Sequence, residues 1–230
     1  MKLVDYFTQV MTESHLWSHP RLPFKARVHE GHPKLAVVTG ENGTGKSLLV
    51  QLLCSWCRVH EEIQNISVSI RERTGSGLYD MAGMRRAMMF GDETEESTGA
   101  ISIRVLEPAF NTLASRSKEN QSTVLVLDEP ELGLSDGFAN AMGVYLARKT
   151  KALPALAVGL VVVTHSRPLV RGLIDELEET PTFIKLGVEQ DLSTWLKGEA
   201  PKSLKELEAL PFECRKKQHI IREIISEAKR

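Results

Sequence analysis

The chain has 230 residues, of which 42% are hydrophobic and 26% charged, a composition typical of a globular protein with one sizeable core. Its formal net charge of -1 does not indicate a strongly basic nucleic-acid-binding protein. No apolar run approaches the roughly 20 residues of a membrane-spanning helix, and the N-terminal residues lack the unbroken apolar region of a signal peptide. We therefore expect a single cytoplasmic domain, residues 1–230, with no membrane contact.

From residue 35 onward, short apolar runs alternate with longer amphipathic runs. The apolar runs predict strands at residues 35–40, 66–70, 122–129, 156–166 and 182–186. The amphipathic runs predict helices at residues 46–59, 136–149 and 167–179. This alternation predicts an α/β fold with a mostly parallel sheet flanked by helices on both faces.

Three regions lie outside this alternating pattern. Residues 1–34 are expected to form N-terminal strands or an arm, and residues 66–98 a short insertion that is rich in glycine and methionine after its first strand. Residues 200–230 are expected to form a helical extension, an amphipathic helix with an apolar face that docks on the domain and consists of Ile220, Ile221, Ile224 and Ile225.

A glycine-rich segment joins the first predicted strand to the helix that follows it. It consists of Gly40, Glu41, Asn42, Gly43, Thr44, Gly45, Lys46 and Ser47, and it matches the pattern G-x-x-x-x-G-K-[ST] in full before the apolar run that begins at Leu48. Glycines let consecutive backbone N–H groups turn toward one anion at the start of a helix. The segment predicts a site for ATP and Mg²⁺, in which Lys46 reaches the β- and γ-phosphates and the Ser47 hydroxyl binds the metal ion.

Two later strands end in residues that suit the same chemistry. Asp128 ends the strand in "VLVLDEPELGLSD", at the edge of the sheet where open α/β folds bind ligands. Its carboxylate is a suitable partner for Mg²⁺, and the adjacent Glu129 is positioned to deprotonate an attacking water. The strand in "VVVTHS" ends near His165, which we expect to reach a γ-phosphate.

Taken in this order, "GENGTGKS", "VLVLDEPELGLS" and "VVVTHS" resemble the ABC-type ATPase superfamily over about residues 35–170. The resemblance implies a P-loop fold with a RecA-like sheet and two ATP molecules bound between two copies arranged head to tail. It also implies that Glu129 is the catalytic base, that His165 senses the γ-phosphate, and that Lys46 assists the reaction.

The family also has a signature segment that reaches across the dimer to the partner's ATP. The best match is "EESTGAISIRVL", where Ser97 and Gly99 precede or open a predicted helix. Ser97 would offer its hydroxyl, and the Gly99 N–H would complement phosphate charge. The match is partial, and an ordinary serine helix cap is the alternative.

The spacing of the motifs distinguishes among ABC-type machines. Only the short interval between Lys46 and Ser97 is available for an insertion, whereas transporter subunits place a larger helical subdomain there. The chain therefore resembles compact, stand-alone AAA/ABC-like ATPases of bacteria, phages and mobile elements. We expect an ATP-driven dimer that acts as a switch in a DNA-related or defence-related process. The nucleotide-binding subunit of a transporter is the main alternative, and a small-molecule kinase is a weaker one.

Basic residues suggest a possible contact with nucleic acid, although such runs are more often solvated faces. The candidates are Arg71, Arg73, Arg85, Arg86, Arg215, Lys216 and Lys217. The expected partners are thus a second copy of the chain and either a nucleic acid or an effector protein.

Overall fold

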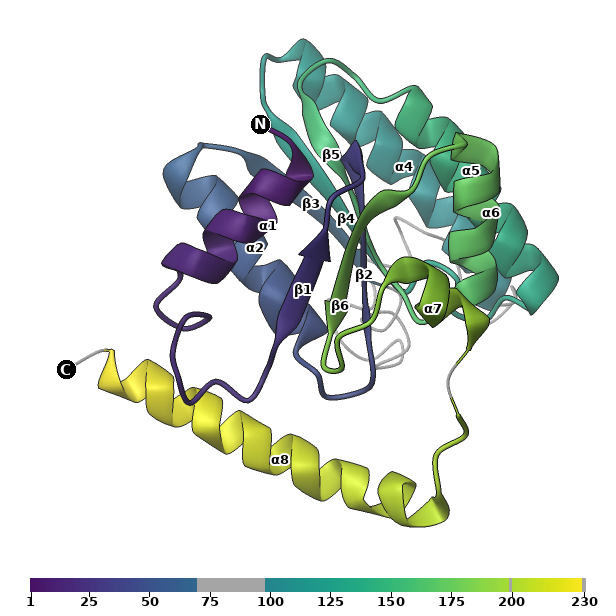
Figure 1. Ribbon diagram of the computed structural model, residues 1–230. Helices are drawn as coiled ribbons and strands as arrows, with labels where there is room; N and C mark the ends of the chain where they lie inside the picture. The colour runs from purple at the N-terminus through teal and green to yellow at the C-terminus, as the bar shows by residue number, and fades with distance from the viewer. Residues whose placement is uncertain (70–97, 199, 229–230) are drawn as a thin grey trace, which may run out of the picture.

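The computed structural model describes residues 1–69, 98–198 and 200–228 (Figure 1). The described strands are β1 (Ala26–His29), β2 (His32–Gly40), β3 (Gln64–Ser69), β4 (Thr123–Asp128), β5 (Ala157–Val163) and β6 (Pro181–Leu186). They form one sheet in the order β1-β6-β2-β5-β4-β3. Only the edge strand β1 is antiparallel to its neighbour among these strands, and all other pairs are parallel. The predicted α/β fold with a mostly parallel sheet is confirmed.

Helices cover both faces of this sheet. They are α1 (Leu3–Glu13), α2 (Lys46–His60), α4 (Thr98–Lys118), α5 (Asp136–Lys151), α6 (Arg167–Leu177), α7 (Leu192–Lys197) and α8 (Leu204–Glu227). Helices α1 and α2 lie on one face, and α4, α5 and α6 lie on the other (Figure 1). No helix of the described residues is long and apolar enough to cross a membrane.

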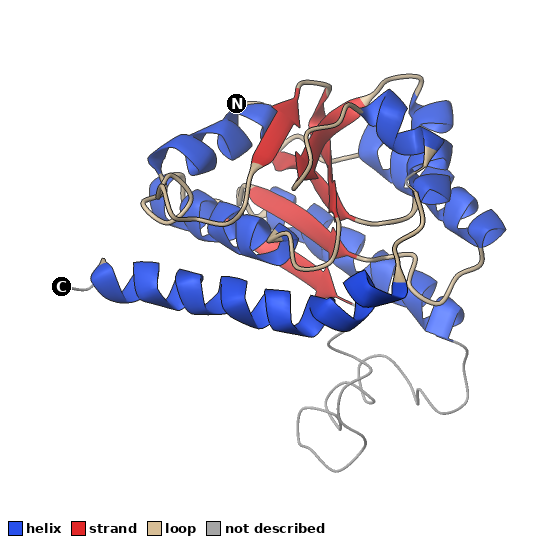
Figure 2. Cartoon of the chain, turned by 60° about the horizontal axis from the view of Figure 1, so that its bottom comes forward, coloured by secondary structure: helices blue, strands red, loops and turns tan. Residues whose placement is uncertain are grey.

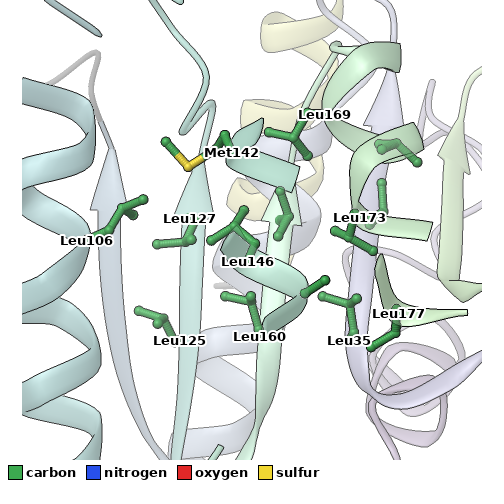
Figure 3. Close-up of a cluster of buried hydrophobic side chains, with 14 of the residues drawn as sticks. Leu35, Leu106, Leu125, Leu127, Met142, Leu146, Leu160, Leu169, Leu173 and Leu177 are labelled. Atoms are coloured by element: carbon green, nitrogen blue, oxygen red, sulfur yellow. The ribbon is translucent and has the colours of Figure 1, made fainter. Parts of the chain in front are cut away.

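The central strands are buried on both faces because their aliphatic residues alternate between two clusters. In β2, Leu35 and Val37 belong to the cluster under α4, α5 and α6, whereas Ala36 and Val38 belong to the cluster under α1 and α2. Figure 3 shows the first cluster, in which Leu125 and Leu160 of neighbouring strands pack beneath the helices. This two-sided burial explains why the strands appear in the sequence as continuous apolar runs.

The N-terminal region differs from the expected strands or arm, because it begins with helix α1. Leu3, Tyr6, Phe7 and Val10 recur at helical spacing, and all four are buried against the sheet. The strands in this region are β1 and the first residues of β2, which begins after a gap of two residues. A short amphipathic helix thus covers the sheet beside α2.

The segment expected as an insertion begins inside the sheet. Its first residues belong to β3, which pairs in parallel with β4 at the edge of the sheet. The remainder of the segment, including Ser97 and the arginines at positions 71, 73, 85 and 86, lies outside the described residues. The second half of the signature match, from Thr98, opens helix α4.

Helix α8 crosses the end of the sheet instead of covering a face. In Figure 2 it runs beneath the domain as a long helix that ends at the C-terminus. Ile224 is fully buried in the cluster under α1 and α2, and Ile220 and Ile221 pack against the same cluster. Three of the four predicted isoleucines therefore anchor the C-terminal half of α8, whereas Ile225 is 40% exposed.

Candidate active site

The glycine-rich segment joins β2 to α2 in a conformation that requires glycine. Gly43 and Gly45 have φ values of 70° and 94°, in the left-handed region that other residues seldom adopt. A Cβ atom on Gly45 would lie 2.6 Å from Cδ2 of Phe24, and one on Gly43 would lie 2.5 Å from Sγ of Cys214. Both the backbone conformation and the close neighbours therefore exclude a side chain at these two positions.

Lys46 folds back over the segment that precedes it. Its Nζ donates to the carbonyl oxygens of Gly40 at 2.8 Å and Glu41 at 3.0 Å, and the residue is 8% exposed. The Thr44 hydroxyl donates to the Glu41 oxygen as well, at 2.7 Å. The ammonium group is thus held at the first turn of α2, where the helix dipole also favours an anion.

Asp128 and Glu129 lie where β4 ends. Asp128 pairs with Val163 in the parallel ladder, and the Glu129 N–H donates to the Val163 oxygen at 2.8 Å. Glu129 has a φ of 52°, a left-handed conformation that costs a residue with a side chain about 1 kcal/mol. Because Glu129 is also 7% exposed, the fold holds this carboxylate in a special and largely buried position.

His165 follows β5, the strand between β2 and β4 in the sheet. Its Nε2 lies 3.8 Å from Oε1 of Glu129, which places the imidazole beside the carboxylate. His165 also lines a pocket of about 490 Å³ together with Glu41 and Asn42. The structure thus brings together the histidine, the glutamate and the glycine-rich segment.

A second pocket, of about 230 Å³, joins the glycine-rich segment to the end of β4. From the predicted site it is lined by Asn42, Gly43, Gly45, Lys46, Ser47, Asp128 and Glu129. The parallel strands that carry these residues end at one edge of the sheet, so side chains more than 80 positions apart in sequence share one pocket. A hydroxyl, a carboxylate and an ammonium group face the same space, a donor set that suits a phosphate with a hard cation.

One stabilising pair at this site was not predicted from the sequence. The buried Thr164 hydroxyl donates to Oε1 of Glu131 and accepts a hydrogen bond of 2.8 Å from the Ser166 N–H. Burial raises the pKa of the Glu131 carboxyl above its usual value. Since Thr164 precedes His165 and Glu131 follows Glu129, the pair joins the two loops that carry the candidate catalytic groups.

We predict that Thr164→Val destabilises the fold by about 1–3 kcal/mol, because the valine leaves the largely buried Glu131 carboxyl and the partly buried Ser166 N–H without this hydroxyl. Urea unfolding of the variant and the wild type measures the difference. Thr12→Val is the matched control, because the exposed Thr12 hydroxyl bonds only within its own helix in the described contacts. Equal effects of the two substitutions would contradict the assigned role of Thr164.

Of three aromatic residues that precede the glycine-rich segment, two lie in the hydrophobic core and one lines the candidate site. Tyr6 and Trp17 are buried in the cluster under α1 and α2. Phe24 is only partly buried, contacts Gly45 and lines the 230 Å³ pocket. The sequence alone did not distinguish these three residues, because each precedes the glycine-rich segment in an apolar context.

Helix α8 completes the wall of the 230 Å³ pocket. Cys214, Lys217, Gln218 and Ile221 line it opposite the glycine-rich segment. Lys217, which the sequence suggested as a nucleic-acid contact, donates from Nζ to the Gly43 oxygen at 3.2 Å. The amphipathic pattern predicted that α8 docks on the domain, but no local signal indicated that it docks beside the glycine-rich segment.

The structure describes only part of the proposed signature segment. Ser97 lies outside the described residues, and Gly99 lies in the first turn of α4. Cys54 and Cys57 form a C-x-x-C pair on α2 and do not line either pocket. Burial raises the pKa of the Cys57 thiol to about 12, so this residue remains a protonated core residue at neutral pH.

Comparisons with known proteins add little to this geometry. No protein-family model matches the chain, and no curated protein matches it. Among solved structures, the chain is similar to the Aeropyrum pernix ORC2 protein in its ADPNP-ADP complexes, with 12% sequence identity and a TM-score of 0.34. The match covers 76% of this chain and 43% of that one, so the chain spans less than half the length of its structural neighbour. At this level the similarity supports no argument, and the account of function rests on the residues of the site.

Proposed function

We propose that the chain binds and hydrolyses ATP with the help of Mg²⁺, as an ABC-type ATPase. The observation that supports the proposal most strongly is the 230 Å³ pocket, which unites the glycine-rich segment, Lys46 and Ser47 with Asp128 and Glu129. The sequence predicts for each of these residues a role in binding phosphate, binding Mg²⁺ or activating water. Their convergence requires the strand order β2-β5-β4, which the sequence pattern did not specify.

The chain's own groups divide the work as follows. Backbone N–H groups from Gly43 to Ser47 surround the β-phosphate, and Lys46 exchanges its carbonyl partners for the β- and γ-phosphate oxygens. The Ser47 hydroxyl and the Asp128 carboxylate would hold Mg²⁺. This ion, when bound, would neutralise negative charge on the phosphates while the γ-phosphoryl group is transferred to water.

Glu129 serves as the general base for the attacking water. Its carboxylate is largely buried and lines the same pocket as Lys46 and Ser47. His165, 3.8 Å from that carboxylate, contacts the γ-phosphate and reports its presence to the loop that follows β5. Loss of the γ-phosphate on hydrolysis would then release this loop.

The same proposal assigns the second half of each site to another copy of the chain. Ser97 and Gly99 of one copy would contact the ATP bound to the other, so that ATP drives head-to-tail dimerisation and hydrolysis reverses it. Such a dimer acts as a nucleotide-dependent switch on a nucleic acid or an effector protein.

Mixing two inactive variants tests this shared site. Lys46→Ala removes the phosphate-binding lysine, and Ser97→Arg blocks the segment offered to the partner. Each variant alone is expected to be inactive, whereas an equal mixture regains about a quarter of wild-type phosphate release, because half of the dimers hold one intact site out of two. A mixture as inactive as its components would argue against sharing between copies, while hydrolysis by the wild type would still support the ATPase assignment.

A further inference from the structure

Helix α8 lies directly on the glycine-rich segment. Lys217 Nζ is 3.2 Å from the Gly43 oxygen, and Sγ of Cys214 occupies the space that a side chain on Gly43 would need. Near the start of the helix, Lys202 Nζ forms an ion pair of 2.7 Å with Oε1 of Glu41. The helix and the residues just before it therefore contact the segment at several points, and the helix runs across the end of the sheet (Figure 2).

Several independent contacts hold α8 in this place. Ile224 is buried with 0% exposure in the cluster under α1 and α2. Arg21, in the loop before β1, pairs with Glu223 and Glu227 near the end of the helix. The exposed ion pairs add little energy, but together with the buried isoleucine they fix which face of the helix meets the pocket.

The strand order divides the pocket into two sides. On one side of β2 lie β5 and β4, which carry His165, Asp128 and Glu129. On the other side lie β6 and β1, and Phe24 lies just before β1. The proposed function places the terminal phosphate next to Glu129. The rest of a bound nucleotide then has Phe24 and α8 as its neighbours in the pocket.

Lys217 lies on that second side, close to both neighbours. Its Nζ is 6.0 Å from the centre of the Phe24 ring, as well as within hydrogen-bond distance of the Gly43 oxygen. The Gly43 N–H belongs to the segment that surrounds the phosphates, so a rotation of the flexible lysine side chain brings its ammonium group to the same phosphates. Lys46 makes a comparable bond to loop carbonyls before a phosphate replaces them.

The pocket is small for a nucleotide while α8 remains docked. Its volume is about 230 Å³, whereas ligand pockets commonly measure about 300–1,000 Å³. A nucleotide that fills and widens this space touches the wall formed by Lys217, Gln218 and Ile221.

We propose that α8 is a wall of the nucleotide site and that Lys217 is a phosphate-binding residue supplied by the C-terminal helix of the same chain. The inference rests on the proposed nucleotide binding and adds a residue that lies outside the family resemblance. The bond from Lys217 to the Gly43 oxygen is the ligand-free arrangement, and the phosphates take over the ammonium group when the nucleotide binds.

The test compares the dissociation constant of a fluorescent methylanthraniloyl derivative of ATP for the wild type and Lys217→Met. We expect the variant to bind about tenfold to a hundredfold more weakly, because it loses a charge-assisted hydrogen bond to phosphate. Lys217→Arg should recover most of the affinity. Lys216→Met is the matched control, since Lys216 is the neighbouring lysine on α8 and does not line the pocket.

Competition by inorganic tripolyphosphate separates a phosphate contact from a purely structural effect. The inhibition constant of tripolyphosphate should rise for Lys217→Met by a factor similar to that for the nucleotide, while the thermal unfolding midpoint matches that of Lys216→Met. Unchanged affinity in Lys217→Met, or weaker nucleotide binding with unchanged tripolyphosphate competition, would overturn the assignment.

Tighter binding by Lys217→Met would also overturn it, because it would mean that α8 obstructs the site. Failure of the proposed function has a different signature. If the wild type does not bind the probe, or Lys46→Ala binds it equally well, the nucleotide site itself is wrong.

Discussion

Replacement of Lys46 by alanine is expected to abolish measurable nucleotide binding. The wild-type ammonium group is held at the first turn of α2 by two carbonyl oxygens, beside the hydroxyl of Ser47 and the carboxylate of Asp128. Its removal deletes a charge-assisted bond to phosphate and leaves the two carboxylates of the pocket without this positive charge, so affinity should fall by about a hundredfold or more. Isothermal titration with ATP and Mg²⁺ measures the loss.

Lys118→Ala is the control for this experiment. Lys118 ends α4 and is exposed, and the next strand, β4, begins beyond it at the edge of the sheet opposite to Asp128. The control should bind ATP as the wild type does. Retention of wild-type affinity by Lys46→Ala would refute the assignment of the glycine-rich segment as the phosphate site.

Replacement of Glu129 by glutamine is expected to separate binding from hydrolysis. The amide has the shape of the carboxylate but does not accept the proton of the attacking water, so phosphate release should fall by about 10²–10⁴-fold. ATP affinity should be retained, because the phosphate-binding groups are unchanged. Single-turnover phosphate release and equilibrium ATP binding measure the two properties separately.

The same variant should accumulate an ATP-dependent dimer, since hydrolysis no longer reverses association. Light scattering with and without ATP measures the mass, and Glu119→Gln, an exposed position at the end of α4, is the control for hydrolysis. If the Glu129→Gln variant hydrolyses ATP at the wild-type rate, Glu129 is not the general base. A Glu129→Gln variant that stays monomeric with bound ATP would instead count against the head-to-tail arrangement.

Local sequence patterns were sufficient to predict the sheet strands and the residues at their ends. The aliphatic runs before Gly40, Asp128 and His165 became β2, β4 and β5, because residues that are buried on both faces must be apolar throughout. Helix α1 carries an equally local signal in the helical spacing of Leu3, Phe7 and Val10, so residues 1–34 hold a helix in addition to a strand.

The parts that were not predicted depend on contacts between distant residues. Thr164 meets Glu131 across 33 positions, and Lys217 meets Gly43 across 174. In their local sequence, Thr164 looks like an ordinary threonine and Lys217 like an ordinary surface lysine. The position of Phe24 at the pocket likewise depends on where the chain folds back, since Tyr6 and Trp17 also precede the glycine-rich segment but lie in the core.

The central claim is that one pocket, formed by the glycine-rich segment and the end of β4, hydrolyses ATP. Steady-state phosphate release by the purified chain tests it most directly, measured with ATP and Mg²⁺ for the wild type, Lys46→Ala and Glu129→Gln. We expect release by the wild type that stops when EDTA removes Mg²⁺, and loss of release in both variants with retained ATP binding only in Glu129→Gln. Release that persists in Lys46→Ala and Glu129→Gln at the wild-type rate would contradict the claim.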